Sequence, residues 1–175
     1  VIGARRNPLA LATLDHLIEA GVHFGHRTSR WNPKMARYIY GKRNLIHIID
    51  LRQTLRGLIR ARHFLTQIVA DGKQVLWVGT KRQSREIIKD MATRTAMPFV
   101  NERWIGGCLT NFTTIRERLR RLEELEKMET DGSSRSLSKK HLASLAREKR
   151  KILRNLAGIR DMNRLPGVLV GVDPN

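Results

Sequence analysis

The segment from Val100 to Met128, VNERWIGGCLTNFTTIRERLRRLEELEKM, separates two kinds of sequence in this chain. Before it, short apolar runs alternate with amphipathic helical patterns, whereas within and after it long helical patterns carry dense charge. Two glycines and a tryptophan, in the run Trp104 to Gly107, stand at the transition. We therefore expect a compact core that is followed, from about residue 112, by a projecting helical element.

Two helical patterns of similar length form this element. A polar turn cluster at 131–134 separates them, and the second helix is expected to begin near Ser138. The first helix is capped either by Asn111 or by a capping box of Thr114 and Glu117. Three- and four-residue steps relate the apolar residues Phe112, Ile115, Leu119, Leu122, Leu142, Leu145, Ile152, Leu156 and Ile159. Such narrow stripes, joined by a short turn, predict an antiparallel coiled-coil hairpin over residues 112–160.

The sequence around this insertion predicts an α/β domain. Short apolar runs typical of buried strands occur at 45–49, 75–78, 98–100 and 168–172. Helical patterns separate the first three of these runs. Each helical pattern begins with a capping-box pair, Asp50 with Gln53 and Thr80 with Gln83. This alternation predicts a parallel sheet covered by helices. The expected division is therefore 1–111 for a helix at 9–20, a basic loop and the first part of the α/β domain, 112–160 for the hairpin, and 161–175 for the return strand.

Composition indicates a polyanionic partner. The chain has 34 Lys and Arg against 16 Asp and Glu, a net charge of +18 and a pI near 11.4. Nucleic acid fits better than a membrane surface, because no apolar run approaches the ~20 residues of a membrane span and the cations are scattered. One cysteine, Cys108, excludes an intrachain disulfide and is typical of a reducing compartment.

A basic segment at 21–44, GVHFGHRTSRWNPKMARYIYGKRN, is the strongest candidate for contact with RNA. Cations neutralise phosphates, and flat rings stack on bases or riboses, so an RNA surface combines both. The alternative is a surface loop whose aromatic side chains pack back onto the core, and the net charge favours RNA. The cations and the ring predicted to bind RNA are Arg27, Arg30, Trp31, Lys34, Arg37, Lys42 and Arg43.

Other motifs are incomplete. Gly79 to Arg82 follows a strand and precedes a helix, where anions bind, but it lacks the spacing of a nucleotide-binding loop. An RNA phosphate held by Lys81 and Arg82 is the better functional interpretation, and a well-capped helix is the simpler one. His23 and His26 lack further ligands for a metal, so we assign no metal site. We also assign no cofactor and no catalytic residue. Trp104 to Gly107 is a hinge, a contact surface, or both.

Several blocks of the sequence together resemble one family, the bacterial and organellar form of small-ribosomal-subunit protein two. They are Ala20 to His26, Trp31 to Met35, Ile39 to Asn44 with Ile46 to Ile49, Val78 to Arg82, Arg103 to Asn111, Gly158 to Met162 and Leu165 to Gly167. The resemblance extends from about Leu14 to the last residue. It implies a non-enzymatic, Rossmann-like (flavodoxin-like) α/β domain with an inserted coiled-coil hairpin.

The resemblance also implies partners. Family members bind small-subunit rRNA next to neighbouring ribosomal proteins, and bacterial ones help to recruit the large OB-repeat protein S-one. We accordingly expect a ribosome-bound, non-membrane protein that is not a homo-oligomer, in a bacterial cytoplasm or an organelle. Members continue beyond the position of Val172, so the C-terminal part of the usual domain is expected to be missing here.

Two further groups of residues complete the sequence-based predictions. Lys81, Arg82, Arg85 and Arg103 are expected to make secondary contacts with RNA phosphates. Trp104, Gly106, Gly107 and Asn111 are expected to form the hinge that aims the hairpin. The alternatives to an rRNA-binding protein are a protein-docking hairpin and, as a weaker possibility, a nucleotide-dependent α/β enzyme.

Overall fold

The computed structural model describes residues 13–131 and 138–173. The chain divides into two compact units, with the boundary between Gln67 and Ile68. This boundary differs from the predicted ones at 111 and 160, which concern a helical insertion that lies entirely within the second unit. Each unit is described by itself below.

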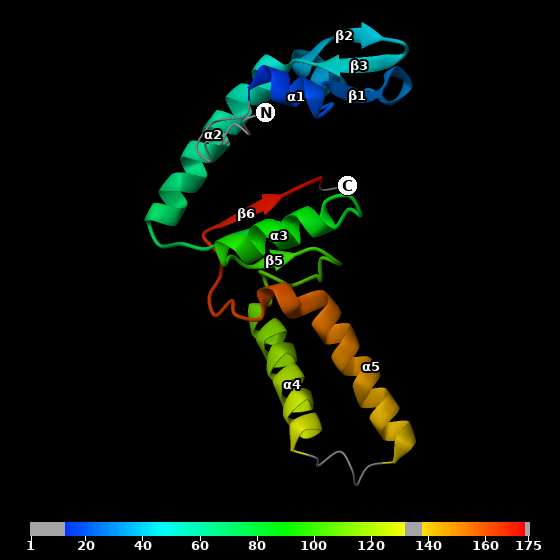
Figure 1. Ribbon diagram of the computed structural model, residues 1–175, viewed down its shortest axis with the longest axis vertical. Helices are drawn as coiled ribbons and strands as arrows, with labels where there is room; N and C mark the ends of the chain where they lie inside the picture. Colours follow the sequence, from blue (N-terminus) through cyan, green and yellow to red (C-terminus); the bar gives the residue numbers. More distant parts are fainter. Residues whose placement is uncertain (1–12, 132–137, 174–175) are drawn as a thin grey trace, which may run out of the picture. The chain divides into compact units, whose positions relative to one another are not determined.

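The first unit is built around a small antiparallel sheet (Figure 1). Helix α1 (Leu14–Glu19) comes first, and the strands β1 (Phe24–Arg27), β2 (Ile39–Arg43) and β3 (Ile46–Ile49) form the order β1-β3-β2. The short 3-10 helices η1 (Thr28–Arg30) and η2 (Pro33–Tyr38) connect β1 to β2. The described part of the helix predicted at 9–20 is therefore confirmed, whereas two strands and two short helices occupy the segment that was predicted to be a loop.

The prediction that the run at 45–49 is a strand of the parallel sheet was wrong. β3 pairs antiparallel with β1 and with β2, and its side chains are only half-buried. A short apolar run does not by itself reveal the direction of its neighbours. The turn between β2 and β3 also lacks the usual sequence signal of a hairpin. Asn44 and Leu45 both have positive φ, at 48° and 61°, and such a turn usually has glycine where Leu45 stands.

Helix α2 (Leu51–Ala70) follows β3 and confirms the predicted helix. The Asp50 carboxylate accepts a hydrogen bond from the backbone N–H of Arg52 at 2.9 Å, so Asp50 caps the helix. The expected capping box with Gln53 is not formed, because the Asp50 N–H donates to the Tyr38 carbonyl oxygen at 2.8 Å. No described side chain of α2 is fully buried, and Leu58, Ile59 and Phe64 are exposed. Within residues 13–131 and 138–173, no helix is long and apolar enough to cross a membrane.

The second unit contains a parallel sheet, as predicted. Its strands β4 (Val75–Val78), β5 (Phe99–Val100) and β6 (Val168–Gly171) lie in the order β5-β4-β6. Trp77 is in register with Phe99 on one side and with Val170 on the other. The predicted strands at 75–78, 98–100 and 168–172 are thus confirmed, and the chain is a mixed α/β protein with a parallel sheet.

Helix α3 (Arg85–Thr95) connects β4 to β5 but begins later than predicted. Its N-cap is Ser84, so the expected capping box of Thr80 and Gln83 is not formed. The Ser84 hydroxyl instead donates to the Lys81 carbonyl oxygen at 2.9 Å and closes a turn before the helix. A Cβ on Gly79 would lie 2.6 Å from Ile88 Cγ1, so this glycine is needed for close packing of the turn on α3.

The inserted segment forms two helices, α4 (Phe112–Thr130) and α5 (Lys139–Leu156), which run in opposite directions (Figure 1). Asn111 occupies the N-cap position of α4, so the helix begins where the first alternative placed it. The Asn111 side chain accepts a hydrogen bond from the Thr114 hydroxyl at 2.9 Å and makes no capping bond to the backbone. Helix α5 begins directly after Ser138, as expected, and the Ser138 side chain caps it. Only Asp131 of the predicted turn at 131–134 lies within the described residues.

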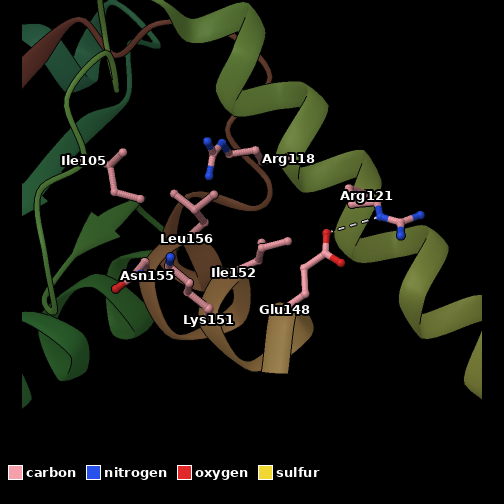
Figure 2. A pocket seen from close by; sticks show the side chains of 8 residues that line it. All are labelled: Ile105, Arg118, Arg121, Glu148, Lys151, Ile152, Asn155 and Leu156. Atoms are coloured by element: carbon pink, nitrogen blue, oxygen red, sulfur yellow. Dashed lines mark hydrogen bonds and ion pairs between the residues drawn. The ribbon is translucent and has the colours of Figure 1, made fainter. Parts of the chain in front are cut away.

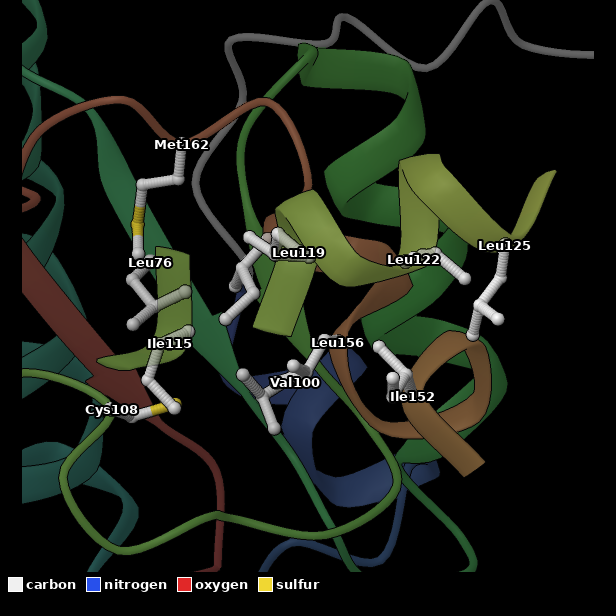
Figure 3. Packing of buried hydrophobic residues seen from close by; sticks show 11 residues of the cluster. Leu76, Val100, Cys108, Ile115, Leu119, Leu122, Leu125, Ile152, Leu156 and Met162 are labelled. Atoms are coloured by element: carbon white, nitrogen blue, oxygen red, sulfur yellow. The ribbon is translucent and has the colours of Figure 1, made fainter. Parts of the chain in front are cut away.

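The bases of these helices form the core of the second unit (Figure 3). Leu122 and Leu156 are almost fully buried, with exposed fractions of 0% and 1%. Figure 3 also shows Leu76 of the sheet beside Ile115 and Cys108, and Val100 of the sheet near Leu156. After α5, the short helix η4 (Ala157–Ile159) brings Ile159 into the same cluster. The apolar stripes that predicted the hairpin therefore bury against the sheet as well as against each other.

Two glycines should respond oppositely to substitution by alanine. A Cβ on Gly158 would lie 2.3 Å from the carbonyl oxygen of Phe99, whereas nothing lies within 4 Å of a Cβ on Gly57. Gly158→Ala should therefore destabilise the fold by about 1–3 kcal/mol. Gly57→Ala, inside α2, should stabilise it by about 0.5–1 kcal/mol. Urea unfolding of both variants checks this, and a neutral Gly158→Ala would contradict the close approach of η4 to β5.

Candidate nucleic-acid interface

The cations predicted in the basic segment gather in the first unit on consecutive elements. Arg27 ends β1, Arg30 ends η1, Lys34 and Arg37 lie in η2, and Lys42 and Arg43 lie in β2. All six are exposed, and none forms an ion pair with a carboxylate in the described part of the chain. Because their charges are not neutralised within the protein, they are available to an external polyanion.

Aromatic rings lie among these cations and are largely turned outward. Trp31 is 48% exposed and Tyr40 is 83% exposed, which argues against the interpretation that these rings pack back onto a core. Tyr38 is half-buried, and the Arg37 guanidinium lies over its ring at 4.7 Å from the centroid. The first unit thus combines exposed cations with exposed rings, the pairing that single-stranded RNA requires.

His23 and His26, which the sequence raised as a possible metal pair, serve no such cluster in the described residues. No group of three or more His, Cys, Asp or Glu side chains there is arranged to hold a metal ion. The His23 ring instead packs against Phe24, with centroids 4.1 Å apart. This contact gives His23 a packing role.

A further row of cations on α2 was missed by the sequence-based prediction. Arg52, Arg56 and Arg60 are spaced by four residues, so they lie on one face of the helix, and all three are exposed. None of them forms an ion pair within residues 13–131 and 138–173. The i, i+4 spacing of arginine without a matching acid was the sequence signal that could have identified this row.

The cations predicted as secondary contacts lie in the second unit and differ in availability. Lys81 forms an ion pair with Asp173, and Arg85 pairs with Glu102 at 3.2 Å while its Nε donates to the Thr80 carbonyl oxygen at 3.1 Å. Arg82 and Arg103 are exposed and unpaired among the described residues. The structure therefore leaves Arg82 and Arg103 free for a phosphate and holds Lys81 and Arg85 in internal contacts.

The predicted hinge residues form the connection between β5 and α4. Gly107 has φ of +84°, a conformation that disfavours any residue with a side chain, and the Asn111 N–H donates to its carbonyl oxygen at 2.9 Å. Trp104 is half-buried and packs against the core cluster. Gly106, by contrast, has open space around it.

Cys108, which follows Gly107 in the sequence, is a buried thiol with an exposed fraction of 2%. Burial raises the pKa of Cys108, and a backbone hydrogen bond at Ile105 opposes this shift. A raised thiol pKa disfavours the reactive thiolate, so the structure supports a packing role for this side chain.

This shift predicts a loss of stability at alkaline pH. Below the ordinary thiol pKa of roughly 8.5, the thiol is neutral in both the folded and the unfolded chain. The contribution of the buried neutral thiol to the free energy of unfolding is then fully present. As the pH rises, the unfolded chain ionises first, so stability falls until the pH passes the raised folded value. Denaturant titrations from about pH 7 to about pH 10 should show a steeper loss for the natural chain than for Cys108→Ala. Parallel curves would contradict the burial of this thiol.

A cavity of about 370 Å³ lies between α4, α5 and the preceding loop (Figure 2). Ile105, Ile152 and Leu156 form its apolar wall, and the cations Arg118 and Lys151 lie at its margin. Arg121 is held by Glu148 at 3.4 Å, the contact drawn in Figure 2, and by Glu124 at 3.0 Å. The hydrogen bonds with Glu124 and then Glu148 raise the pKa of Arg121, which therefore stays charged.

Comparison with known proteins matches this sequence to one family. A family model described as ribosomal protein S2 matches residues 17–175. Proteins named small ribosomal subunit protein uS2 are similar: 58% identical over 166 residues in Rhodopirellula baltica and 49% over 166 residues in Borreliella burgdorferi strain B31. A third, from Mycobacteroides abscessus, is 50% identical over 167 residues. Each alignment covers 95% of this chain, which spans 64%, 64% and 60% of these relatives respectively.

Proposed function

The chain belongs to the ribosomal protein S2 family, and we propose that it is a structural constituent of the small ribosomal subunit that binds small-subunit rRNA. The observation that carries this proposal is the set of six exposed cations in the first unit, none neutralised by a carboxylate among the described residues. Exposed rings interleave with them, and Arg52, Arg56 and Arg60 extend the positive surface along α2. No catalytic role is assigned, in keeping with a family of ribosomal proteins.

The proposed contacts fall into two groups. Arg27, Arg30, Trp31, Lys34, Arg37, Lys42 and Arg43 make the main contacts with RNA. Arg82 and Arg103 contact phosphates in a secondary way, and Lys81 and Arg85 do so only if they exchange their carboxylate partners for phosphate. Each such exchange costs an ion pair, so these two contribute less than the unpaired cations.

Cosedimentation tests the proposal. The tagged chain, expressed in a bacterial host, is expected to migrate with small ribosomal subunits in a sucrose gradient at low salt and to dissociate as salt rises. Cosedimentation only with non-ribosomal material would overturn the assignment. The same proposal places the protein on the ribosome as a single copy, in a bacterial cytoplasm or an organelle. In bacteria, S-one is among its proposed neighbours.

A finer proposal concerns the helices α4 and α5. Their seam and the ion pairs that cross it, Arg121 with Glu148 at 3.4 Å and Lys149 with Glu129 at 2.5 Å, support an antiparallel coiled-coil hairpin inserted in a Rossmann-like domain. Gly107 and Asn111 support a joint that aims this hairpin, with Trp104 anchoring it on the core. That further polypeptide completes the sheet beyond β6 stays a prediction.

The cavity of Figure 2 favours a second role, docking of a neighbouring protein by the hairpin. An acidic side chain with an apolar base would match Arg118, Lys151 and the wall behind them. A deletion of residues 116–154 would remove most of the two helices, but it would not test docking cleanly. It also removes side chains of the core, namely Leu119, Leu122, Leu125 and Ile152.

Charge reversal at the cavity is the sharper test of docking. Arg118→Glu with Lys151→Glu should leave the chain on the small subunit and release one neighbouring protein, as measured by mass spectrometry of purified subunits. Arg120→Glu with Arg150→Glu, exposed cations that do not line the cavity, is the matched control. Equal loss in both double variants would show that charge alone, and not the cavity, matters.

A further inference from the structure

The cavity beside Trp31 differs from the rest of the basic surface in the chemistry of its lining. It measures about 510 Å³, within the range of sites that bind small molecules. Its lining combines an aromatic ring, a cation, polar side chains and an apolar side chain. The lining residues are Thr28, Trp31, Lys42, Asn44, Leu45 and His47. A surface that only attracts phosphates would need no more than the cations.

Trp31 and His47 are arranged as the floor of a stacking site. Their ring centroids lie 6.0 Å apart at an interplanar angle of 35°, so His47 supports the indole ring from one side. Trp31 nevertheless remains 48% exposed. A large ring that is supported by a neighbour and still accessible offers a rigid platform at little entropic cost to the planar group that stacks on it.

His47 supplies a second observation. Both of its ring nitrogens are buried and have no hydrogen-bond partner among the described residues. Buried polar atoms of this kind are uncommon in folded proteins, because each loses its hydrogen bond to water without replacement. Since neither nitrogen is exposed, His47 lines the cavity with its other atoms and offers no hydrogen bond to a ligand there.

The turn that closes the cavity is held in a conformation the sequence does not favour. Leu45 has φ of 61°, a strained value for a residue with a branched side chain, and it is 77% exposed. An apolar side chain held outward on a strained turn gains nothing from burial in the free protein. It does contribute an apolar side chain to the cavity that Trp31, Lys42 and Asn44 also line.

From these features we infer that the cavity binds one unpaired nucleobase of a single-stranded RNA segment. The base stacks on Trp31, its polar edge faces the Asn44 amide, and Lys42 contacts the adjoining phosphate. The inference rests on the proposed function, since it names the part of an RNA that this surface recognises. Double-stranded RNA would not satisfy the site, because its bases are already stacked and paired.

The test compares the full chain's affinity for two labelled strands by fluorescence anisotropy. One is a single-stranded RNA of about ten uridines, and the other is the same strand without bases, which carries the same phosphates. The natural chain should bind the strand with bases roughly 5- to 150-fold more tightly. Trp31→Leu should abolish this preference and leave affinity for the base-free strand unchanged, and Trp31→Phe should restore part of it.

Two more variants keep the test decisive. Leu45→Gly relieves the positive φ, so it should fold at least as well as the natural chain and should still reduce the preference for bases. Phe64→Leu removes an exposed ring of α2 that does not line this cavity, and it should have no effect on the preference. An equal effect of Phe64→Leu would overturn the assignment to Trp31.

The remaining outcomes separate the two proposals. Equal affinity of the natural chain for both strands would overturn the nucleobase site while leaving phosphate binding, and so the proposed function, intact. Absence of binding to either strand, together with absence from small subunits, would overturn the proposed function itself. If Trp31→Leu keeps the preference for bases but releases a protein from the subunit, the cavity is a protein contact and the inference is wrong.

Discussion

Replacing Leu156 by alanine is expected to lower the free energy of unfolding by about 2–5 kcal/mol, the cost of removing a large aliphatic side chain from a packed core. Leu156 is 1% exposed and packs in the cluster that joins α4 and α5 to the parallel sheet. The gap left by the substitution lies where three elements meet, so none of them can close it alone. Urea unfolding followed by circular dichroism measures the loss.

Leu153→Ala is the matched control for this prediction. Leu153 lies on the same helix but is 40% exposed, so its removal should cost less than half as much. Equal losses in the two variants would contradict the packing shown in Figure 3. Because the cluster contains residues of both the sheet and the hairpin, Leu156→Ala should also unfold the two together in a single transition.

Neutralising the six exposed cations of the first unit together should abolish most of the salt dependence of RNA binding. Each phosphate contact contributes about 0.7 to the slope of log affinity against log salt on a single strand, so six substitutions should reduce it by roughly 4. At low salt the affinity should fall by at least about a thousandfold. The variant carries Arg27→Gln, Arg30→Gln, Lys34→Gln, Arg37→Gln, Lys42→Gln and Arg43→Gln.

A variant with the same change in net charge controls for non-specific attraction. It replaces six exposed cations of the second unit by glutamine: Lys89, Arg94, Arg120, Lys127, Lys139 and Lys140. Its slope should stay close to that of the natural chain. Since none of the six cations of the first unit forms an ion pair in the described residues, their loss should not unfold the protein, and circular dichroism checks this. A slope that is unchanged in the first variant would refute the proposed interface.

The candidate site shows how far the sequence alone could lead. The exposure of Arg27, Lys42 and the neighbouring cations could be predicted, because a dense run of charged side chains stays in contact with water whatever the fold. The internal pairs of Lys81 with Asp173 and Arg85 with Glu102 could not, because the first joins residues 92 positions apart. Whether a cation is free or paired depends on which distant carboxylate the fold brings close to it.

The same difference separates the helices and strands that were predicted from those that were not. Helices α2, α4 and α5 and strands β4 and β6 could be predicted, because periodicity, capping residues and short apolar runs are local properties of the chain. The antiparallel pairing of the run at 46–49 with β1 and β2, and the cavity that Trp31 and His47 share, could not be predicted in this way. Pairing direction and cavities arise from contacts between segments distant in the chain, and no local pattern of residues records them.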